Sequence, residues 1–500
     1  MNVYFYNKEY FVMGEVQMNS AVFKLISFWI EKLRKEWNIP GIAISVVQKN
    51  QVLFSSGFGE RNIKERLPVN TETLFPIASS TKPFTAMALS ILLNEQNLDW
   101  DTPIKQYWPS FQMQDPYATD HLTLRDIACH RSGLPRHDML LHNTTLTREQ
   151  IAESLRFLDP NLPVRYVWQY SNIMYILIGF FIEQHTGMTW EEWVKNKIFE
   201  PLEMSSTLFS VEDLQHVDNY AMPYTAVGNE IIELPLTNLD TQGPAGSIIS
   251  NVADLSSWLS LLLNQGQTRG GSVISEARLN EMIFPQIVVG PGEFPEIPYT
   301  FYGLGWFVEI YRGRKLISHG GNTAGYSTHI SFMPDDDLGI VILANKEVTQ
   351  LPECIAYHMY DQILGLGPID WNTRFKVKNE QLHQALASMR NSDYSITEID
   401  DPEPSYPISC YLGEFNHPAY GSAVVYEREG SLFLNYKDAE LPLYHYNQNI
   451  FKVVDERNDA QFLIEFNVNE NGKCECLNMP LEPTPGVSDI SFHLVKNNII

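Results

Sequence analysis

Strand-like segments occur in two groups in this chain, and a long helical stretch separates them. The first group, residues 42–47 and 52–58, is joined by a short turn and follows a helical pattern over 20–37. Strand patterns return at 305–310, 315–318, 326–333 and 339–344. The first unit thus starts and ends with strands around a helical insertion, which favours one antiparallel sheet. We therefore expect an α+β unit: an antiparallel sheet flanked by helices, an all-helical lobe, and a cleft between them.

A different pattern begins after the last helix of this unit, expected at 350–364. Residues 366–405 start polar and helix-like and finish in a proline- and acid-rich run, which is typical of a linker. Short strand patterns separated by turns follow at 422–427, 431–436, 450–454, 461–468 and 490–495, and predict a small all-β barrel or sandwich. Because 500 residues exceed one core, we expect an extension (1–18), a first unit (19–365), a linker (366–405) and a β-rich domain (406–500).

The acidic composition excludes some classes of partner. A formal net charge of -25 and a pI near 4.9 argue against binding to nucleic acid or to an anionic membrane. The longest apolar run, 173–182, falls short of the roughly 20 residues that span a bilayer. The first residues lack the basic and apolar parts of a signal peptide, so we expect a cytoplasmic protein. Five scattered cysteines indicate neither a disulfide framework nor a zinc site, and we expect no metal and no cofactor.

Ser79 and Lys82 mark the one place where a serine precedes a lysine by three positions. They stand where a strand-like stretch gives way to an apolar helical pattern over 83–93. On a helix this spacing puts both side chains on one face, where a lysine of lowered pKa can take the serine proton. The alternative is an N-cap serine with a solvated lysine. A pattern this short can occur by chance, so the other motifs of the chain must decide between these two interpretations.

Tyr170 and Asn172 form the one Y-x-N sequence in the chain, between a proline-containing loop and the apolar run 173–182. A tyrosine there can serve as a phenolate base, or as the acid that returns a proton to a leaving group. The asparagine can hydrogen-bond a substrate amide or the lysine. The alternative is a tyrosine that packs at the cap of a buried helix.

The third motif consists of His319, Gly320, Gly321 and Asn322. Consecutive glycines after a strand allow a substrate backbone to lie close against the strand edge. The N–H of Asn322 can then supply half of an oxyanion hole, with the N–H of Ser79 as the other half. A second H-x-G at 185–187 is interpreted as structural, because its glycine fits the C-cap of the preceding helix.

In this order, S-x-x-K, Y-x-N and H-x-G resemble the serine β-lactamase and penicillin-binding protein superfamily. The chain is most similar to class C β-lactamases and to the esterases and D-amino-acid peptidases related to them. The resemblance covers residues 20–365. Supporting segments match in order at 122–126, 129–135, 243–247 and 302–306.

The resemblance implies a role for each motif. Ser79 would be the acylated nucleophile, Lys82 the group that activates it, and Tyr170 the general base and acid. Asn172 would contact the substrate or the lysine. Asn322 would offer its backbone N–H to the oxyanion.

His319 stands where many relatives carry the lysine of K-T-G, and Gly321 matches the glycine of that motif. A lysine there is a permanent cation that recognises a β-lactam or a terminal carboxylate, whereas a histidine is only partly charged at pH 7. This departure favours a D-amino-acid peptidase, aminopeptidase or esterase that forms an acyl-enzyme with a small-molecule or short-peptide substrate. The alternatives are a β-lactamase or DD-carboxypeptidase, a transacylase or peptide cyclase, and a non-catalytic penicillin-binding-like sensor.

Residues 411–421 (YLGEFNHPAYG) resemble the lipocalin-like barrel appended to some members of this superfamily. In relatives such a barrel can lie over the catalytic cleft or mediate assembly. The resemblance therefore implies a lipocalin-like domain that is a candidate specificity element, and it leaves assembly into a homo-oligomer open.

Overall fold

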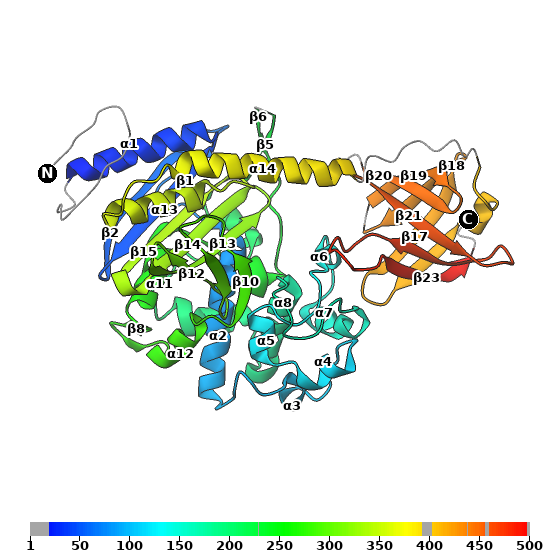
Figure 1. Ribbon diagram of the computed structural model, residues 1–500, viewed down its shortest axis with the longest axis horizontal. Helices are drawn as coiled ribbons and strands as arrows, with labels where there is room; N and C mark the ends of the chain where they lie inside the picture. Colours follow the sequence, from blue (N-terminus) through cyan, green and yellow to red (C-terminus); the bar gives the residue numbers. More distant parts are fainter. Residues whose placement is uncertain (1–19, 229, 393–402, 438, 456–459, 498–500) are drawn as a thin grey trace.

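A large sheet and a closed barrel form the two main parts of the molecule (Figure 1). The computed structural model describes residues 20–228, 230–392, 403–437, 439–455 and 460–497. The predicted antiparallel sheet is confirmed: nine strands lie in the order β10-β11-β12-β13-β14-β15-β1-β2-β3, in which the edge strand β3 is Leu67–Pro68. The expected N-terminal extension and most of the acidic end of the expected linker lie outside the described residues.

The two distant groups of predicted strands pair directly. β1 (Gly41–Gln48) lies between β2 (Gln51–Asn62) and β15 (Leu338–Ala344), and both pairings are antiparallel. Every residue of β15 is buried, as is β1 up to its last residue. These two central strands therefore join the ends of the first unit through one core.

Helices cover both faces of the sheet because the side chains of a strand alternate between its faces. Alternate apolar side chains of β1 pack with α1 (Ser20–Glu36) and α13 (Leu351–Ile363) on one face. The intervening side chains share the other core with α11 (Val252–Leu263) and the helical lobe.

Some of the remaining strands of the sheet were predicted from the sequence and others were not. β12 (Phe307–Tyr311) and β14 (Tyr326–Met333) confirm predicted strands, whereas β13 (Arg314–Thr323) runs on through the glycines at which the pattern predicts its end. The sequence patterns do not predict β10 (Ile287–Pro291) or β11 (Tyr299–Tyr302). The glycine and proline in β10 are residues typical of turns, which hides the strand.

The predicted helical lobe lies between β2 and β10. Its two longest helices, α2 (Lys82–Glu95) and α8 (Asn172–Thr186), are buried along most of their length. The predicted C-cap is confirmed, because Gly187 ends α8 with a left-handed φ of 70°. The Asn251 side chain caps α11. The other helices of this stretch are α3 (Ile104–Tyr107), α4 (Pro116–His121), α5 (Leu124–Ala128), α6 (Asp138–Leu141), α7 (Arg148–Ser154), α9 (Trp190–Val194), α10 (Gly243–Gly246) and α12 (Glu276–Met282).

The C-terminal part confirms the predicted barrel. Each strand pairs with the next and the last closes on the first, the up-and-down order of lipocalin-like barrels. The helix α14 (Trp371–Ser392) runs toward it from the first unit (Figure 1). Three strands lack a clear sequence pattern: β16, β19 and β22. The eight strands are β16 (Gly413–His417), β17 (Gly421–Arg428), β18 (Ser431–Tyr436), β19 (Ala439–Asn447), β20 (Ile450–Asp455), β21 (Ala460–Val468), β22 (Cys474–Met479) and β23 (Ile490–Asn497).

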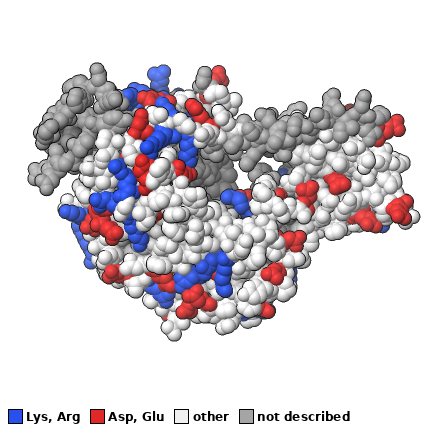
Figure 2. Space-filling model, viewed as in Figure 1, with Lys and Arg blue, Asp and Glu red and all other residues white. Residues whose placement is uncertain are grey.

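The surface carries both signs of charge. On the face shown in Figure 2, basic and acidic side chains are interspersed. Within the described ranges, no helix combines the length and the apolar content that crossing a bilayer takes.

A pair of carboxyl groups lies between β12 and α13. Burial raises the pKa of Glu309, and burial together with this neighbour raises the pKa of Glu353 to about 7. The hydroxyl of Tyr357 donates to Glu353 Oε1 at 2.9 Å and lies 3.5 Å from Glu309 Oε2. An acid with a raised pKa in the folded state ionises more easily in the unfolded state, so it destabilises the fold at any pH above its ordinary pKa. The carboxyl of Glu353 therefore costs stability as the pH rises from its ordinary pKa of 4.5 through 7.

Glu353→Gln should accordingly stabilise the protein at pH 8.5 but not at pH 4, where the wild-type carboxyl is already protonated. At pH 8.5 we expect the free energy of unfolding to rise by about 1–2 kcal/mol. Each pKa unit corresponds to about 1.4 kcal/mol, and the gain falls short of the whole shift because water reaches part of the side chain. Urea unfolding at the two pH values measures the difference, with the exposed Glu276→Gln as the control. Equal stabilisation at both pH values would contradict the prediction.

Candidate active site

Ser79 lies in a tight turn that leads into α2. The turn is a 3₁₀ helix, Ala78–Thr81, so the serine precedes the α-helix itself, which begins at Lys82. Ala78 has a left-handed φ of 49°, a conformation that a residue with a Cβ adopts only when its surroundings hold it there. The sequence motif predicted the serine on the first helical turn, and the structure places it one turn earlier.

The neighbouring serine anchors this turn to the sheet. Ser80 is buried, and its Oγ donates to the carbonyl of His319 at 3.0 Å and lies 3.1 Å from Thr328 Oγ1. The hydroxyl of Thr328 in turn donates to the carbonyl of Ile77 at 3.0 Å. Strands β13 and β14 therefore hold the residues on either side of Ser79.

Lys82 is fully buried and has three polar neighbours. Its Nζ lies 3.1 Å from Ser79 Oγ, 2.8 Å from Asn172 Oδ1 and 2.8 Å from the carbonyl oxygen of Ala245. Burial holds the pKa of the amine well below its usual 10.5, although Asp138 opposes that effect. A neutral amine has two hydrogens and one lone pair. In its neutral form the amine can direct these two hydrogens to Asn172 and Ala245 and its lone pair to the hydroxyl of Ser79, whereas in its charged form it donates to all three oxygens.

Tyr170 covers this pair with its ring. The ring centroid lies 4.7 Å from Lys82 Nζ and 5.2 Å from the guanidinium of Arg136, and the ring of His130 lies 4.4 Å away. Burial raises the pKa of the tyrosine above its usual 10, and a hydrogen bond with Ser79 opposes that shift. The side chain is therefore a neutral phenol at physiological pH, in contact with the nucleophile.

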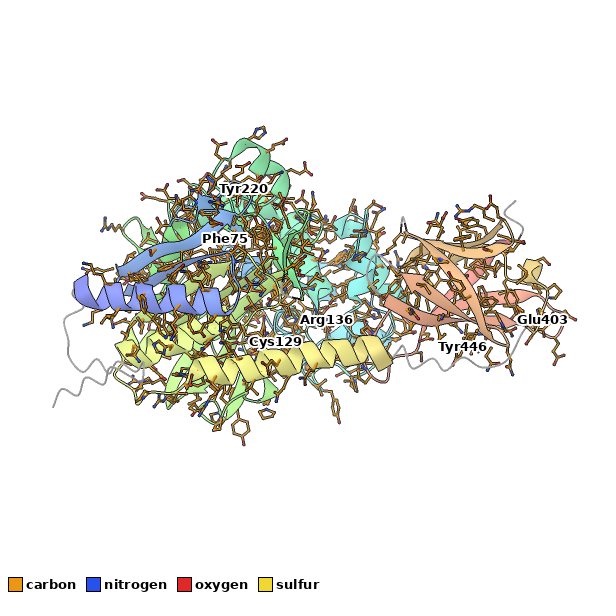
Figure 3. All side chains as sticks on the ribbon, turned by 90° about the horizontal axis from the view of Figure 1, so that it is seen from above. Phe75, Cys129, Arg136, Tyr220, Glu403 and Tyr446 are labelled. Atoms are coloured by element: carbon orange, nitrogen blue, oxygen red, sulfur yellow. The ribbon has the colours of Figure 1, made fainter. Side chains whose placement is uncertain are left out.

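Asn172 links the lysine to two charged residues that no sequence pattern marks. Its Oδ1 accepts from Lys82, and its Nδ2 donates to Asp138 Oδ1 at 3.1 Å. Asp138 Oδ2 accepts from Arg136 Nε at 2.6 Å. Figure 3 labels Arg136 where the helical lobe meets the barrel. Arg136 and Asp138 directly follow the supporting segment 129–135, but nothing in their own sequence indicates a functional role.

His319 lies beside this group with both ring nitrogens engaged. Its Nδ1 lies 2.7 Å from the carbonyl oxygen of Gly320, and its Nε2 lies 3.0 Å from the hydroxyl of Tyr302. A carbonyl only accepts, so Nδ1 carries the hydrogen and Nε2 accepts from the tyrosine. Burial and the nearby Lys82 lower the pKa of the imidazole to about 3. At neutral pH this position therefore carries no charge.

The two glycines and Asn322 run along β13 past the nucleophile turn. A Cβ on Gly321 would lie 2.1 Å from the carbonyl oxygen of Ile77, so the close approach of strand and turn requires a glycine. The side chain of Asn322 turns away to β14, where its Oδ1 accepts from Ser327 at 2.7 Å. The oxygen of this side chain is therefore engaged within the sheet.

Gly321→Ala should separate β13 from the turn that carries Ser79. We expect a loss of about 1–3 kcal/mol in stability from the overlap with backbone, and about a 100-fold loss of activity from misplacement on the order of 1 Å. Thermal unfolding and hydrolysis assays measure both effects. Gly320→Ala is the matched control for stability, because its Cβ would meet only the Thr328 carbonyl, at an ordinary 3.5 Å. Equal destabilisation by the two variants would refute the steric explanation.

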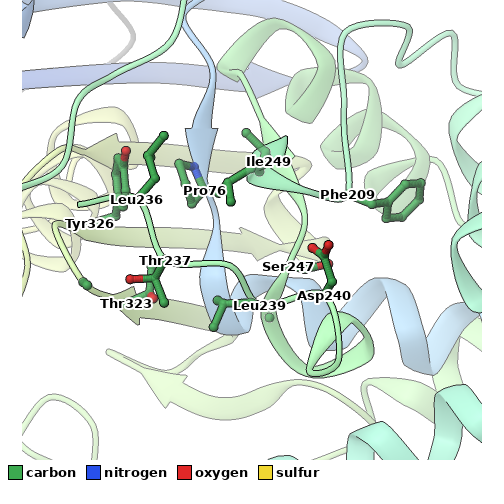
Figure 4. A pocket seen from close by; sticks show the side chains of 13 residues that line it. Pro76, Phe209, Leu236, Thr237, Leu239, Asp240, Ser247, Ile249, Thr323 and Tyr326 are labelled. Carbon is green, nitrogen blue, oxygen red and sulfur yellow. The ribbon is translucent and has the colours of Figure 1, made fainter. Parts of the chain in front are cut away.

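A narrow pocket lies beside the nucleophile turn (Figure 4). Its cavity volume is about 10 Å³, room for about one water molecule, and its wall includes Pro76, Ser247 and Thr323. The Ser247 hydroxyl is buried and has no hydrogen-bond partner among the described residues. Most of the remaining wall is apolar: Phe209, Val211, Leu236, Leu239, Ile249 and Tyr326.

Known proteins share these features in sequence and in fold. The family described as Beta-lactamase matches residues 28–360, and the one described as Domain of unknown function (DUF3471) matches 397–493. The chain is 29% identical over 436 residues to "Unguisins hydrolase ungD'" of Aspergillus campestris, across 83% of this chain and 80% of that relative.

Solved structures share the fold. The octameric penicillin-binding protein homologue from Pyrococcus abyssi superimposes with a TM-score of 0.60 at 22% identity, across 91% of this chain and 97% of that one. The D-amino acid amidase from Ochrobactrum anthropi SV3, complexed with L-phenylalanine amide, superimposes with a TM-score of 0.56 at 21% identity, across 68% and 98%.

Proposed function

This chain belongs to the Beta-lactamase family, and we propose that it is a serine hydrolase that cleaves an amide or ester bond through an acyl-enzyme. The observation that carries the proposal is the geometry of Lys82. Its contacts with Asn172 and Ala245 use both hydrogens of a neutral amine, while Ser79 Oγ lies 3.1 Å from the nitrogen. A nucleophile in contact with its base is what acyl transfer by a serine requires.

In the first step, Lys82 takes the hydroxyl proton as Ser79 Oγ bonds to the substrate carbonyl carbon. The carbonyl π electrons move to the oxygen, which becomes the oxyanion of a tetrahedral intermediate. We assign its stabilisation to the backbone N–H groups of Ser79 and Asn322, which β13 brings to the same turn. His319 has no free nitrogen for catalysis, and we assign it a positioning role beside Tyr302.

Collapse of the intermediate requires a proton for the leaving group. Tyr170, a neutral phenol in contact with Ser79, can donate its proton to the departing amine or alkoxide, and the proton on Lys82 then restores the phenol. The acyl group stays bonded to Ser79 Oγ. A water molecule attacks the ester carbonyl, loses a proton to the same groups and releases the acid. Overall, water is consumed and the serine is regenerated.

We further propose that the substrate is an amino-acid amide or ester without a carboxylate next to the scissile bond. His319 is neutral at pH 7 and cannot supply the cation of K-T-G. The exposed cation near Tyr170, Arg136, directs both Nε and Nη2 to Asp138 at 2.6 Å, so its charge is already paired. Similarity to a named hydrolase and a D-amino acid amidase supports amide chemistry.

A substrate panel tests this proposal. We expect p-nitrophenyl esters and D-amino-acid amides to be turned over faster than the matching L-amides and than a chromogenic cephalosporin, each with Ser79→Ala protein as the blank. Release of free acid in water, rather than transfer to an added amine, identifies a hydrolase. Fast cephalosporin cleavage or strict dependence on a substrate carboxylate would overturn the substrate assignment and leave the nucleophile standing.

A further inference from the structure

The barrel contacts one segment of the helical lobe, residues 136–142, which includes α6 (Figure 1). The backbone N–H of His137 donates to Glu482 Oε2 at 2.5 Å, and its Nδ1 shares a 2.8 Å hydrogen bond with the hydroxyl of Tyr420. Lys437 directs its ammonium group to three backbone carbonyls, one for each of its hydrogens. These belong to Met139, Leu140 and His142.

All three barrel residues come from one end of the barrel. Tyr420 lies between β16 and β17, Lys437 between β18 and β19, and Glu482 between β22 and β23. Alternate loops of an up-and-down barrel lie at the same end. Three loops of that end therefore contact a single short segment of the other unit.

The contact is buried and holds a strained conformation. His137 and Glu482 are 1% and 5% exposed. The φ of His137 is 48°, in the left-handed region that a residue with a Cβ adopts only when its surroundings hold it there. The backbone N–H and the Nδ1 of His137 have their partners on the barrel, while its carbonyl oxygen accepts from the N–H of Leu140 within the segment.

The other side of the same segment contacts the active site. Asp138, the next residue, accepts from Asn172 Nδ2, and Asn172 in turn accepts from Lys82. Arg136, the preceding residue, places its guanidinium 5.2 Å from the ring centroid of Tyr170. His137, which contacts the barrel, is thus directly flanked in sequence by the two residues that contact the groups around the nucleophile.

We propose that the barrel is a positioning element of the active site, and that Glu482 and Lys437 hold residues 136–142 so that Arg136 and Asp138 fix Tyr170 and Asn172. This inference rests on the proposed function, since it requires Ser79 to be the nucleophile. Glu482 and Lys437 touch no reacting group and act only through the segment.

The test measures phosphonylation of Ser79 by a fluorophosphonate, in which Oγ bonds to phosphorus and fluoride leaves, in the full-length protein by intact mass. Lys437→Met and Glu482→Ala should each lower the limiting rate constant kinact by about 10- to 100-fold, the effect of a displacement on the order of 1 Å, with little change in the reagent constant KI. Glu482→Gln keeps an oxygen acceptor for the His137 N–H and should recover most of the rate. The controls are Glu440→Ala and Lys452→Met, whose partners lie within the barrel.

The outcomes separate this inference from the proposed function. If the fluorophosphonate does not modify Ser79 in the wild-type protein, the proposed function fails. If it does, and both Lys437→Met and Glu482→Ala react at the wild-type kinact, the positioning role is overturned and the function stands. A change in KI alone also overturns it. Should the buried change Glu482→Ala prevent folding, the kinact of Lys437→Met decides alone.

Discussion

Ser79→Ala is expected to abolish hydrolysis, lowering kcat by about five to six orders of magnitude, as loss of the nucleophile does in a serine hydrolase. The adjacent hydroxyl cannot replace it, because Ser80 Oγ is buried and bonded to His319 and Thr328. Turnover of the best ester in the panel measures the loss. The fold should survive, since the substitution removes one oxygen from a half-buried side chain.

Ser80→Ala is the matched control for that experiment. It removes a hydroxyl one residue away and should cost about 1–2 kcal/mol of stability, because the His319 carbonyl and the Thr328 hydroxyl lose a partner. The folded Ser80→Ala variant should still form the fluorophosphonate adduct at Ser79. Retained turnover in Ser79→Ala, or loss of the adduct in a folded Ser80→Ala protein, would contradict the assignment.

Lys82→Met is expected to lower kcat/KM by about 10³- to 10⁴-fold, within the range of a lost general base in contact with its nucleophile. Methionine has nearly the length of lysine but accepts no proton. The pH profile should change as well. Only the neutral amine works as a base, so wild-type activity rises with pH through the pKa of Lys82, which burial lowers well below 10.5. That rise should be absent in Lys82→Met.

Lys82→Arg separates charge from basicity. An arginine places a permanent cation near Asn172 and Asp138 and stays protonated in proteins, so it cannot take the serine proton. We expect it to be as inactive as Lys82→Met, as measured by kcat/KM for the same ester. Substantial activity in Lys82→Arg would mean that the lysine acts as a fixed charge, and the base would have to be sought at Tyr170.

Much of the fold was predictable because buried strands and helices carry regular apolar patterns. β14 and β18 match the predicted ranges, and the pairing of β1 with β15 follows from the need to bury both. β10 and β19 escaped prediction because each contains a proline, which usually marks a turn or an edge. Contact with the rest of a sheet or barrel, rather than local preference, makes these segments strands.

The site was predictable only where it depends on rare residue combinations. Ser79, Lys82, Tyr170 and Asn172 stand in short motifs, and the structure brings them together. Asp138 gave no such signal, because its place depends on a left-handed His137 and on barrel loops 283 and 345 residues away from that histidine in the sequence. The neutral state of His319 also depends on burial, which no spacing records.

Location of the covalent adduct tests the central claim most directly. Protein treated with a fluorophosphonate should gain the mass of one phosphonyl group, and tandem mass spectrometry of its peptides should place that group on Ser79 Oγ, with no gain in Ser79→Ala. An adduct on another residue, or an equal gain in Ser79→Ala, would contradict the assignment of Ser79 as the nucleophile that Lys82 activates.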